Sequence, residues 1–383
     1  MKILLVIDHF GPGGAQRQIV ELACGLKQHG HEVEMFVYFP QHDFFRPRIE
    51  EQQIVVHEYS KVGRFSFGVV SSLASLIRKS GFDVIVSFLK SANVYTELAG
   101  LISGGATIVV SERTSHHDDK SRIAAFATRM LHVFSDHIVS NSKTHCAWLQ
   151  GKWWLRKKVT CIYNGLDLES FCPARSAPQA PQELQLLGIG RIGPEKNILN
   201  LIKALELFHD EFEYIPRISW AGQRDESPAG RVYCRQIDEL LESLPGIRSQ
   251  WHWLGVHSEI LELLQQHDAL IHPSSYEGLP NVVCEALAAG LPVLVSDVCD
   301  HPLLIADGER GFLFDADEPA SIAGAISKLQ QLNVHDRRRF SRNAREYAEA
   351  NLGSERMVTA YEALFVRLLS TAADTTAMNQ LDS

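Results

Sequence analysis

Residues 1–39 read MKILLVIDHFGPGGAQRQIVELACGLKQHGHEVEMFVYF, and their pattern decides the fold class. The apolar run from Ile3 to Ile7 predicts a buried strand, and apolar residues then recur at helical spacing as far as Leu26. Gly30 is typical of the position just past a helix, and Val33 to Phe39 predicts a second strand. Strand, helix and strand in this order form a βαβ unit, whose two strands lie parallel in one sheet.

The same alternation continues along the chain in two series. In the first series, further strands are predicted at residues 82–88, 107–111, 137–140 and 159–162. In the second series, strands are predicted at residues 184–189, 217–220, 269–272 and 293–296, with helices near 197–209 and 281–289. Two parallel sheets covered by helices are therefore expected.

Between the two series, apolar periodicity stops and three prolines fall close together, so residues 173–182 are predicted to be a linker. We expect an N-terminal domain over residues 1–172 and a C-terminal domain over residues 183–350. A final helix with a frayed tail is expected over residues 351–383. The predicted fold class is α/β, with two Rossmann-like, doubly wound domains facing a cleft.

Length and charge bound the class of protein. A chain of 383 residues is too long for one ordinary core and fits two domains of about 100–200 residues each. The formal net charge of −9 disfavours nucleic-acid binding, because neutralising phosphates needs a surplus of Lys and Arg. Any basic site must therefore be local.

The cysteines and the apolar segments bear on location. Seven scattered cysteines show neither zinc spacing nor a disulfide framework, so we expect reduced thiols. The first apolar run is too short for a signal peptide, and no segment approaches the roughly 20 apolar residues that span a bilayer. We expect a cytoplasmic protein, with peripheral contact to the inner face of the cell membrane left open.

A glycine-rich turn follows the first predicted strand. Residues 8–17, DHFGPGGAQR, lead into a helix whose free N–H groups and dipole favour an anion, so a phosphate or the acceptor is expected near Gly14. The alternative is a tight turn that binds no ligand. The turn is not a dinucleotide-binding fingerprint, because Gln16 and Arg17 stand where its third glycine would be.

The second domain opens with a similar loop that carries two cations. Residues 190–197, GRIGPEKN, follow the first strand of that domain and place Arg191 and Lys196 at the carboxyl edge of the sheet. A guanidinium fork and a point charge together suit a diphosphate without a metal ion. Two solvated loop charges are the alternative interpretation.

A second loop ends at the same edge. Residues 271–290 read IHPSSYEGLPNVVCEALAAG, in which a strand is followed by a loop carrying Glu277 and by a helix with Pro280 in its first turn. The free N–H groups at the start of that helix can hold phosphate, so Gly278, Leu279 and Asn281 are candidate donor-binding residues. Glu285, one to two turns inside the helix, can accept hydrogen bonds from a ribose. The alternative for Glu285 is an acid on the exposed helix surface.

Several motifs occur in one characteristic order. The chain resembles the retaining GT-B glycosyltransferases of family 4, also called group 1, which include enzymes of lipopolysaccharide, capsule and lipid-linked oligosaccharide assembly. The motifs that carry the resemblance are Gly13-Gly14-Ala15, residues 163–171, Gly190-Arg191 with Lys196-Asn197, the pair Glu277 and Glu285, Val295-Ser296-Asp297, Leu304-Ile305, Asp307-Gly308 and Gly311-Phe312-Leu313.

The resemblance implies an activity and a role for each site residue. Arg191 and Lys196 would hold the diphosphate of a nucleotide sugar, Glu285 its ribose and Glu277 the transferred sugar, and Gly14 would lie beside the phosphates when the domains close. A hexose or N-acetylhexosamine would pass to a glycan, expected to be lipid-linked, with retention of anomeric configuration and without a metal or other cofactor. The leaving phosphate would accept the acceptor's proton. The final helix would cross back to the first domain.

Two segments of the first domain are weaker candidates. Arg113 and His116, in the loop after a predicted strand, could contact acceptor or donor, while a metal cluster or a solvated loop are the alternatives there. The second segment is a basic and aromatic patch that suits an anionic membrane surface or, alternatively, contributes to the core. Its residues are Trp148, Lys152, Trp153, Trp154, Arg156, Lys157 and Lys158.

Three other functions compete with a transferase. A non-catalytic sugar-nucleotide-binding protein is disfavoured because both acids and both cations are present. A dinucleotide-dependent oxidoreductase is disfavoured by the broken glycine fingerprint. A GT-B sugar-nucleotide epimerase shares the architecture, and the order of the motifs favours the transferase.

Overall fold

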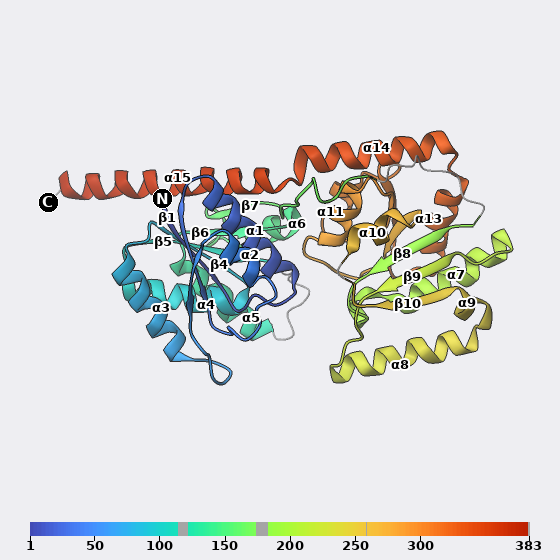
Figure 1. The fold of residues 1–383 in the computed structure, drawn as a ribbon, viewed down its shortest axis with the longest axis horizontal. Coiled ribbons are helices and arrows are strands. Elements are labelled where there is room, and N and C mark those ends of the chain that lie inside the picture. Colours follow the sequence, from blue (N-terminus) through green and yellow to red (C-terminus); the bar gives the residue numbers. More distant parts are fainter. Residues whose placement is uncertain (114–121, 174–182, 258, 382–383) are drawn as a thin grey trace. The chain divides into compact units, whose positions relative to one another are not determined.

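The computed structural model describes residues 1–113, 122–173, 183–257 and 259–381. The chain divides into two compact units, one formed by Met1–Gly165 with Ser354–Ser383 and the other by Leu166–Gly353 (Figure 1). Each unit is a doubly wound α/β domain, which confirms the predicted fold class.

In the first unit, the described residues form a parallel sheet of seven strands in the order β3-β2-β1-β4-β5-β6-β7. The strands are β1 (Lys2–Ile7), β2 (Glu32–Val37), β3 (Val55–Glu58), β4 (Val84–Phe88), β5 (Thr107–Glu112), β6 (His137–Ser140) and β7 (Val159–Cys161). Ile3 lies opposite Val33 on one side and Val84 on the other, so β1 runs through the middle of the sheet.

Helices cover both faces of this sheet. They are α1 (Gly14–Gln28), α2 (Arg46–Glu51), α3 (Phe67–Ser80), α4 (Lys90–Ser103), α5 (Arg122–Leu131), α6 (Lys143–Gln150), α15 (Ser354–Leu381) and the short 3₁₀ helix η2 (His132–Phe134). Ile3 and Leu5 of β1 pack into the core that includes α1 and α15, whereas Leu4 packs into the core that includes α3 and α4. Burial on both faces explains why β1 is an unbroken apolar run.

The second unit repeats this plan. Its described strands are ordered β10-β9-β8-β11-β12-β13, and all neighbours are parallel. The strands are β8 (Gln185–Ile189), β9 (Arg217–Ala221), β10 (Trp251–Gly255), β11 (Ala269–His272), β12 (Val293–Ser296) and β13 (Gly311–Phe314). The helices are η3 (Pro194–Lys196), α7 (Ile198–Phe212), α8 (Pro228–Ser243), α9 (Pro245–Gln250), α10 (Ile260–Gln265), α11 (Asn281–Ala288), α12 (His301–Ile305), α13 (Pro319–Gln331) and α14 (Val334–Asn351).

The unit boundaries differ from the predicted domain ends. Leu166 donates its N–H to Leu352 O at 2.8 Å, and Arg345 donates to Phe171 O at 2.6 Å. These bonds attach the chain after Gly165 to the second unit, ahead of the predicted linker, most of which lies outside the described residues. The final helix, α15, packs on α1 of the first unit.

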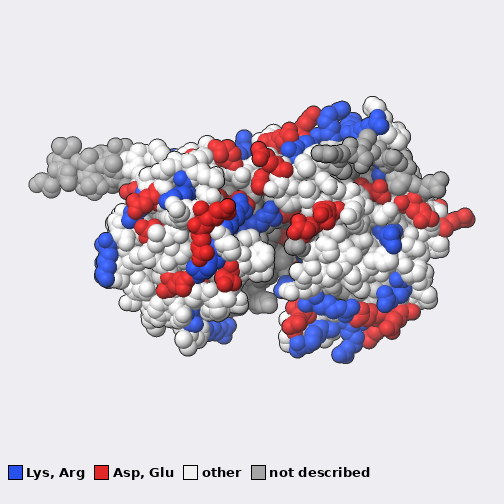
Figure 2. All heavy atoms as spheres, in the orientation of Figure 1, with Lys and Arg blue, Asp and Glu red and all other residues white. Residues whose placement is uncertain are grey.

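Positive and negative side chains are mixed on the part of the surface that Figure 2 shows. Lys and Arg lie beside Asp and Glu over α8, where Arg224 forms two hydrogen bonds to Asp238 at 2.7 Å. Arginines also gather along α14 (Figure 2). Of the helices that the structure describes, none has the length and apolar character needed to cross a membrane.

Candidate active site

The strand order of the second sheet indicates where a ligand would bind. From β8 the sheet continues to β9 and β10 on one side, and from β11 to β12 and β13 on the other. The strand order therefore reverses between the neighbouring strands β8 and β11. The connection after β8 leads toward one edge of the sheet, and the connection after β11 leads toward the other edge. Open parallel sheets bind ligands outside the carboxyl ends of the strands at such a reversal. The loops after Ile189 and His272 are the two that meet there.

Lys196 and Glu277 come together from these two loops. Lys196 Nζ lies 2.5 Å from Glu277 Oε1, and both side chains are largely buried. Ser275 N–H donates to Glu195 O at 2.9 Å and joins the loops through their backbones. Gly190 has φ +146°, and a Cβ there would lie 2.8 Å from Lys196 Cε. A glycine at this position therefore lets the lysine side chain pack against the strand end.

Glu277 is held on its side chain and on its backbone. His272 Nε2 lies 2.9 Å from Glu277 Oε1, so this oxygen contacts both the imidazole and the Lys196 ammonium. Cys299 Sγ donates to Glu277 O at 2.7 Å and accepts the Glu277 N–H at 3.3 Å. The carboxylate is therefore fixed in position before any ligand binds.

The electrostatics keep Glu277 ionised and His272 neutral. Burial alone would raise the pKa of Glu277, but the charge of Lys196 and the hydrogen bond from His272 outweigh burial and hold that pKa well below its usual range. Burial, reinforced by Lys196, lowers the pKa of His272. Because a neutral imidazole must donate to a carboxylate, its proton lies on Nε2.

A second buried imidazole lies behind the first. His301 and His272 have ring centroids 5.8 Å apart, and His301 Nδ1 donates to Ser296 O at 2.7 Å. Burial lowers the pKa of His301 to about 4. Both imidazoles, His272 and His301, are therefore uncharged at neutral pH, and Lys196 supplies the positive charge next to the Glu277 carboxylate.

Arg191 lies on the same loop but in a more open position. Its side chain is 54% exposed, and Nη2 lies 2.8 Å from Glu195 Oε1. Lys196, by comparison, is 14% exposed. The structure thus brings both predicted cations to the edge of the sheet, where the lysine side chain is largely buried and the arginine side chain is exposed.

Glu285 lies in the second turn of α11 and is 5% exposed, so it is not an acid on the exposed helix surface. Asn281 is the first residue of that helix, and Pro280 precedes it as the N-cap rather than lying within the first turn. Val283 and Cys284 both donate their N–H groups to Pro280 O, at 3.2 and 3.3 Å, and the dipole at this helix end favours an anion. Gly278 and Leu279 complete this loop.

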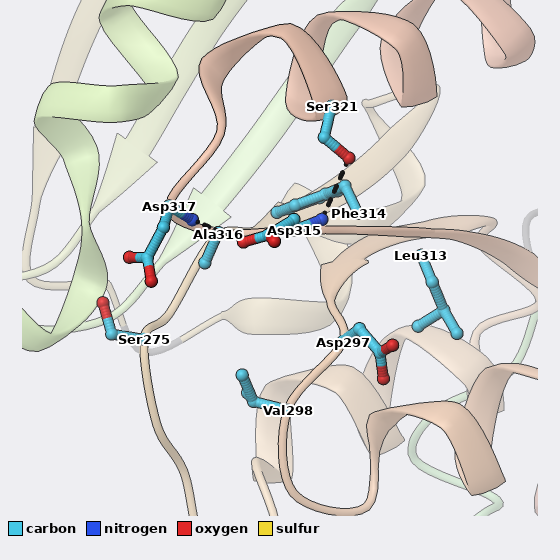
Figure 3. Close-up of a pocket in the computed structure, with 9 residues that line it drawn as sticks. All are labelled: Ser275, Asp297, Val298, Leu313, Phe314, Asp315, Ala316, Asp317 and Ser321. Atoms are coloured by element: carbon cyan, nitrogen blue, oxygen red, sulfur yellow. Dashed lines mark hydrogen bonds between the residues drawn. The ribbon is translucent and has the colours of Figure 1, made fainter.

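A cavity of about 350 Å³ lies at the same edge of the sheet, beyond Ser275 (Figure 3). Three acids line it. The Asp315 carboxylate accepts the Asp317 N–H at 2.9 Å, and the Asp315 N–H donates to Ser321 Oγ at 3.0 Å. The third acid is Asp297. Because carboxylates repel phosphate, this cavity disfavours a diphosphate. The cations of the neighbouring loop favour a diphosphate there instead.

The glycine-rich turn of the first unit leads into α1, which begins at Gly14. Asp8 Oδ1 accepts from Gln16 Nε2 at 3.0 Å and from the His9 N–H at 2.8 Å. Gly11 N–H donates to His9 Nδ1 at 2.9 Å. Side chains of the turn thus form hydrogen bonds with backbone N–H groups of the same turn, which is consistent with a tight turn. A role for Gly14 in binding phosphate stays a prediction.

Arg113 has a structural position that sequence reasoning did not anticipate. Its guanidinium is buried and donates to Ser111 Oγ at 2.9 Å, to Asn164 Oδ1 at 2.5 Å and to Tyr361 OH at 3.1 Å. It therefore ties α15 to the first sheet, and its expected contact with acceptor or donor stays a prediction. His116 lies outside the described residues.

The basic and aromatic patch divides between core and surface. Trp148 and Trp154 pack against the core of the first unit, whereas Trp153 is 84% exposed. Exposed apolar side chains that the sequence analysis did not include lie on α5 and η2 of the same unit: Phe126, Met130, Val133 and Phe134. Phe126 and Trp154 have ring centroids 6.1 Å apart, which links these helices to the tryptophans.

Comparison with protein families assigns both halves of the chain. Residues 12–170 match the model described as Glycosyltransferase Family 4, and residues 174–347 match the model described as Glycosyl transferases group 1. The chain belongs to the family 4, group 1 glycosyltransferases. The predicted family membership is thus confirmed, and the candidate residues Arg191, Lys196, Glu277 and Glu285 lie in the half that matches the group 1 model.

Curated relatives of this glycosyltransferase act in glycan assembly. Lipopolysaccharide glucosyltransferase WaaG of Escherichia coli strain K12 is 25% identical over 361 residues, which is 89% of this chain and 92% of the relative. The UDP-Gal:alpha-D-GlcNAc-diphosphoundecaprenol alpha-1,3-galactosyltransferase of Escherichia coli is 24% identical over 278 residues, 67% of this chain and 69% of the relative.

Solved structures share the fold of this glycosyltransferase. Anabaena HepE in complex with UDP and glucose aligns with a TM-score of 0.82 at 18% identity, covering 96% of this chain and 99% of that protein. The likeness shows the two-domain GT-B architecture and, at this identity, the fold alone.

Proposed function

We propose that this glycosyltransferase moves a hexose or an N-acetylhexosamine from a nucleotide diphosphate sugar to a lipid-linked glycan, with retention of configuration and without a metal ion. The observation that carries the proposal is the largely buried Lys196–Glu277 pair at the strand-order reversal of the second sheet. It puts a cation suited to phosphate beside an ionised acid suited to sugar hydroxyls.

The leaving group sets the requirement for charge. A departing diphosphate accumulates negative charge, and Lys196 with Arg191 supplies positive charge at the site without a coordination sphere. Arg191 would exchange Glu195 for phosphate oxygens, and its planar fork suits two of them. The N-terminal end of α11 adds to this preference, because the positive end of a helix dipole favours an anion.

The acids are assigned by how each is held. Glu277 is kept ionised by Lys196, so at neutral pH it accepts hydrogen bonds from sugar hydroxyls and cannot donate a proton to a leaving group. Glu285 in α11 would accept hydrogen bonds from the ribose, and Gly14 would approach the phosphates when the domains close. With Glu277 ionised, the leaving phosphate is the group proposed to take the acceptor's proton.

A lipid-linked acceptor would bring the enzyme to a membrane surface. Support comes from the exposed Trp153 beside Arg156 and Lys157, and from the diphosphoundecaprenol in the name of one relative. Weak co-sedimentation with anionic vesicles, reversed by salt, is expected. Unchanged sedimentation after Arg156→Gln with Lys157→Gln would contradict this assignment of the surface.

A panel of nucleotide sugars tests the transferase proposal. The purified protein should be stabilised by one nucleotide sugar in thermal unfolding, because a ligand bound only by the folded state raises its stability. The same compound should be hydrolysed slowly, or transferred to an acceptor, at an unchanged rate after exhaustive chelation. Proton NMR of the transferred sugar should show the donor's anomeric configuration. Inversion, or loss of turnover rescued only by a divalent ion, would contradict the proposal.

A further inference from the structure

A second cavity lies in the first unit, at the edge of the sheet opposite the carboxyl ends. Its volume is about 630 Å³, and it opens where β5, β6 and β7 begin, at Thr107, His137 and Val159. Arg367 and Thr371 of α15 form another wall. The cavity is therefore built from three neighbouring strand starts and one turn of the last helix.

The charge of this cavity is not balanced by its own walls. Lys157, Lys158 and Arg367 line it, and among the lining residues Asp136 is the acid. In the described part of the chain, neither Lys157 nor Arg367 has a carboxylate within ion-pair distance. A net positive pocket in a chain with a formal charge of −9 is a local feature that favours an anion.

The remaining cation and the acid are held by backbone groups. Lys158 Nζ donates to Val133 O at 3.0 Å and to Ser135 O at 2.7 Å. Asp136 Oδ2 accepts the Ile108 N–H at 2.7 Å. Both side chains are thus fixed beside the strand starts, and Asp136 offsets only one of the three positive charges that line the pocket.

The pKa of His137 depends on the positive charges that line the pocket. Its ring is nearly fully buried, and Nε2 lies 2.8 Å from Thr160 Oγ1. Burial, with the charges of Arg367 and Lys158, lowers the pKa of His137 to about 4. Two positive charges therefore act on one neutral imidazole in the same cavity.

We propose that this pocket binds a phosphate group, carried by a soluble phosphorylated molecule or by a lipid headgroup. Arg367 offers a fork for two phosphate oxygens and Lys157 a point charge, while the hydroxyls of Thr107 and Thr160 supply neutral donors. The pocket is separate from the proposed donor site: its residues belong to the first unit, and its strand residues lie at amino ends, whereas Gly14 follows the carboxyl end of β1 and the other proposed donor-binding residues belong to the second unit.

Apolar side chains next to the pocket could contact the acyl chains of a lipid whose headgroup phosphate is bound in the pocket. Lys158 bonds to the carbonyl of Val133, and the side chains of Val133 and Phe134 are each about half exposed. A phosphate of a headgroup in the pocket would leave its acyl chains beside these side chains. A soluble phosphate would use the pocket alone.

The test uses the full chain, with inorganic phosphate as the soluble probe and histidine NMR as the readout. Phosphate should shift the His137 ring signals saturably and raise its pKa, because a bound anion offsets the field of Arg367 and Lys158. Arg367→Gln should weaken this binding by about tenfold or more, as loss of charge-assisted hydrogen bonds to an anion does. Arg356→Gln, an exposed arginine of the same helix, is the matched control and should bind like wild type.

A second arm separates the two sources. Vesicles of neutral lipid with and without phosphatidic acid are tested for binding in wild type, Arg367→Gln and Arg356→Gln. Vesicle binding that Arg367→Gln selectively weakens and inorganic phosphate competes for supports a headgroup, and phosphate binding without vesicle binding supports a soluble ligand. Wild-type His137 signals that neither probe moves, or equal phosphate affinity in the two variants, would overturn the proposal. Neither result depends on the donor site or on turnover.

Discussion

At the scale of single residues, the site rests on a division between an inner and an outer cation. Lys196 contacts Glu277 and packs against Gly190, so its position is fixed by two neighbours. Arg191 is more exposed and contacts Glu195. A buried, oriented charge acts in a lower effective dielectric than an exposed one, so Lys196 should contribute more to stabilising the leaving diphosphate.

Substitution of the two cations tests this difference. Lys196→Gln should lower kcat/KM for the donor by about 100- to 1000-fold, and Arg191→Gln by about tenfold, since removing one oriented donor to a developing anion costs this much in related settings. Lys196→Gln also leaves the Glu277 carboxylate without its cation, so thermal unfolding must be recorded alongside turnover. Lys203→Gln, an exposed lysine of α7, is the control. Equal losses in the two variants would contradict the assignment.

The residues of the site differ in how far sequence predicted them. Lys196 and Glu277 could be predicted because each lies in a loop that leaves an apolar strand, and Glu285 because it lies in the helix after the Glu277 loop; the resemblance to the family implied their roles. Cys299 and His301 could not, because they act only through tertiary contacts: the thiol with the Glu277 backbone, and the imidazole packed behind His272. No local pattern marks such contacts.

At the scale of elements, the strands that sequence predicted are mainly those inside the sheets. β1, β4, β8 and β11 are covered on both faces and read as apolar runs. The strands that it missed, β3, β10 and β13, all lie at sheet edges. β3 is partly exposed along its length, so it lacks the apolar signal of an inner strand.

The packing of α15 on α1 depends on a glycine. A Cβ on Gly25 would lie 2.3 Å from Val358 Cγ2, so Gly25→Ala forces a shift of the valine or of the helix. We expect it to destabilise the protein by about 1–3 kcal/mol. Val358→Ala should remove most of that loss when combined with Gly25→Ala, which a double-mutant cycle of unfolding free energies measures.

Gly324 provides the control for that cycle. It lies in α13 with open space where a Cβ would stand. Gly324→Ala should therefore stabilise the protein by about 0.4–1 kcal/mol, through the helix propensity of alanine and the lower entropy of the unfolded chain. Stabilisation by Gly25→Ala as well would show that α15 does not pack on α1 as described.

At the scale of the whole molecule, the first unit contains a buried chain of ionisable groups that predicts how stability depends on pH. His132 Nδ1 lies 2.6 Å from Glu97 Oε1, and His132 Nε2 lies 3.0 Å from Glu112 Oε1. Burial disfavours the charged imidazolium, but hydrogen bonds to Glu112 and Glu97 outweigh burial and raise the pKa of His132 to about 9.

Because the folded-state pKa of His132 lies above the unfolded-state pKa, its contribution to stability is fully present below about pH 6.5 and is lost as pH rises toward 9. The loss in unfolding free energy should be on the order of 3 kcal/mol. Urea unfolding at pH 6 and pH 9.5 measures it. His132→Gln should flatten this dependence, and His209→Gln, an exposed histidine, should not. An equal pH dependence in all three proteins would contradict the prediction.

Glu277 is proposed to bind the transferred sugar and Glu285 the ribose, and calorimetric titration of Glu277→Gln and Glu285→Ala distinguishes these two roles. Each variant is titrated with the nucleoside diphosphate and the nucleotide sugar that the panel selects. Glu277→Gln should bind the bare nucleotide at least as well as wild type, because Lys196 is then released from its ion pair, yet its kcat should fall by about ten- to a thousandfold. Glu285→Ala should bind both ligands poorly and raise the donor KM. Equal loss of bare nucleotide binding in the two variants would contradict the assigned roles.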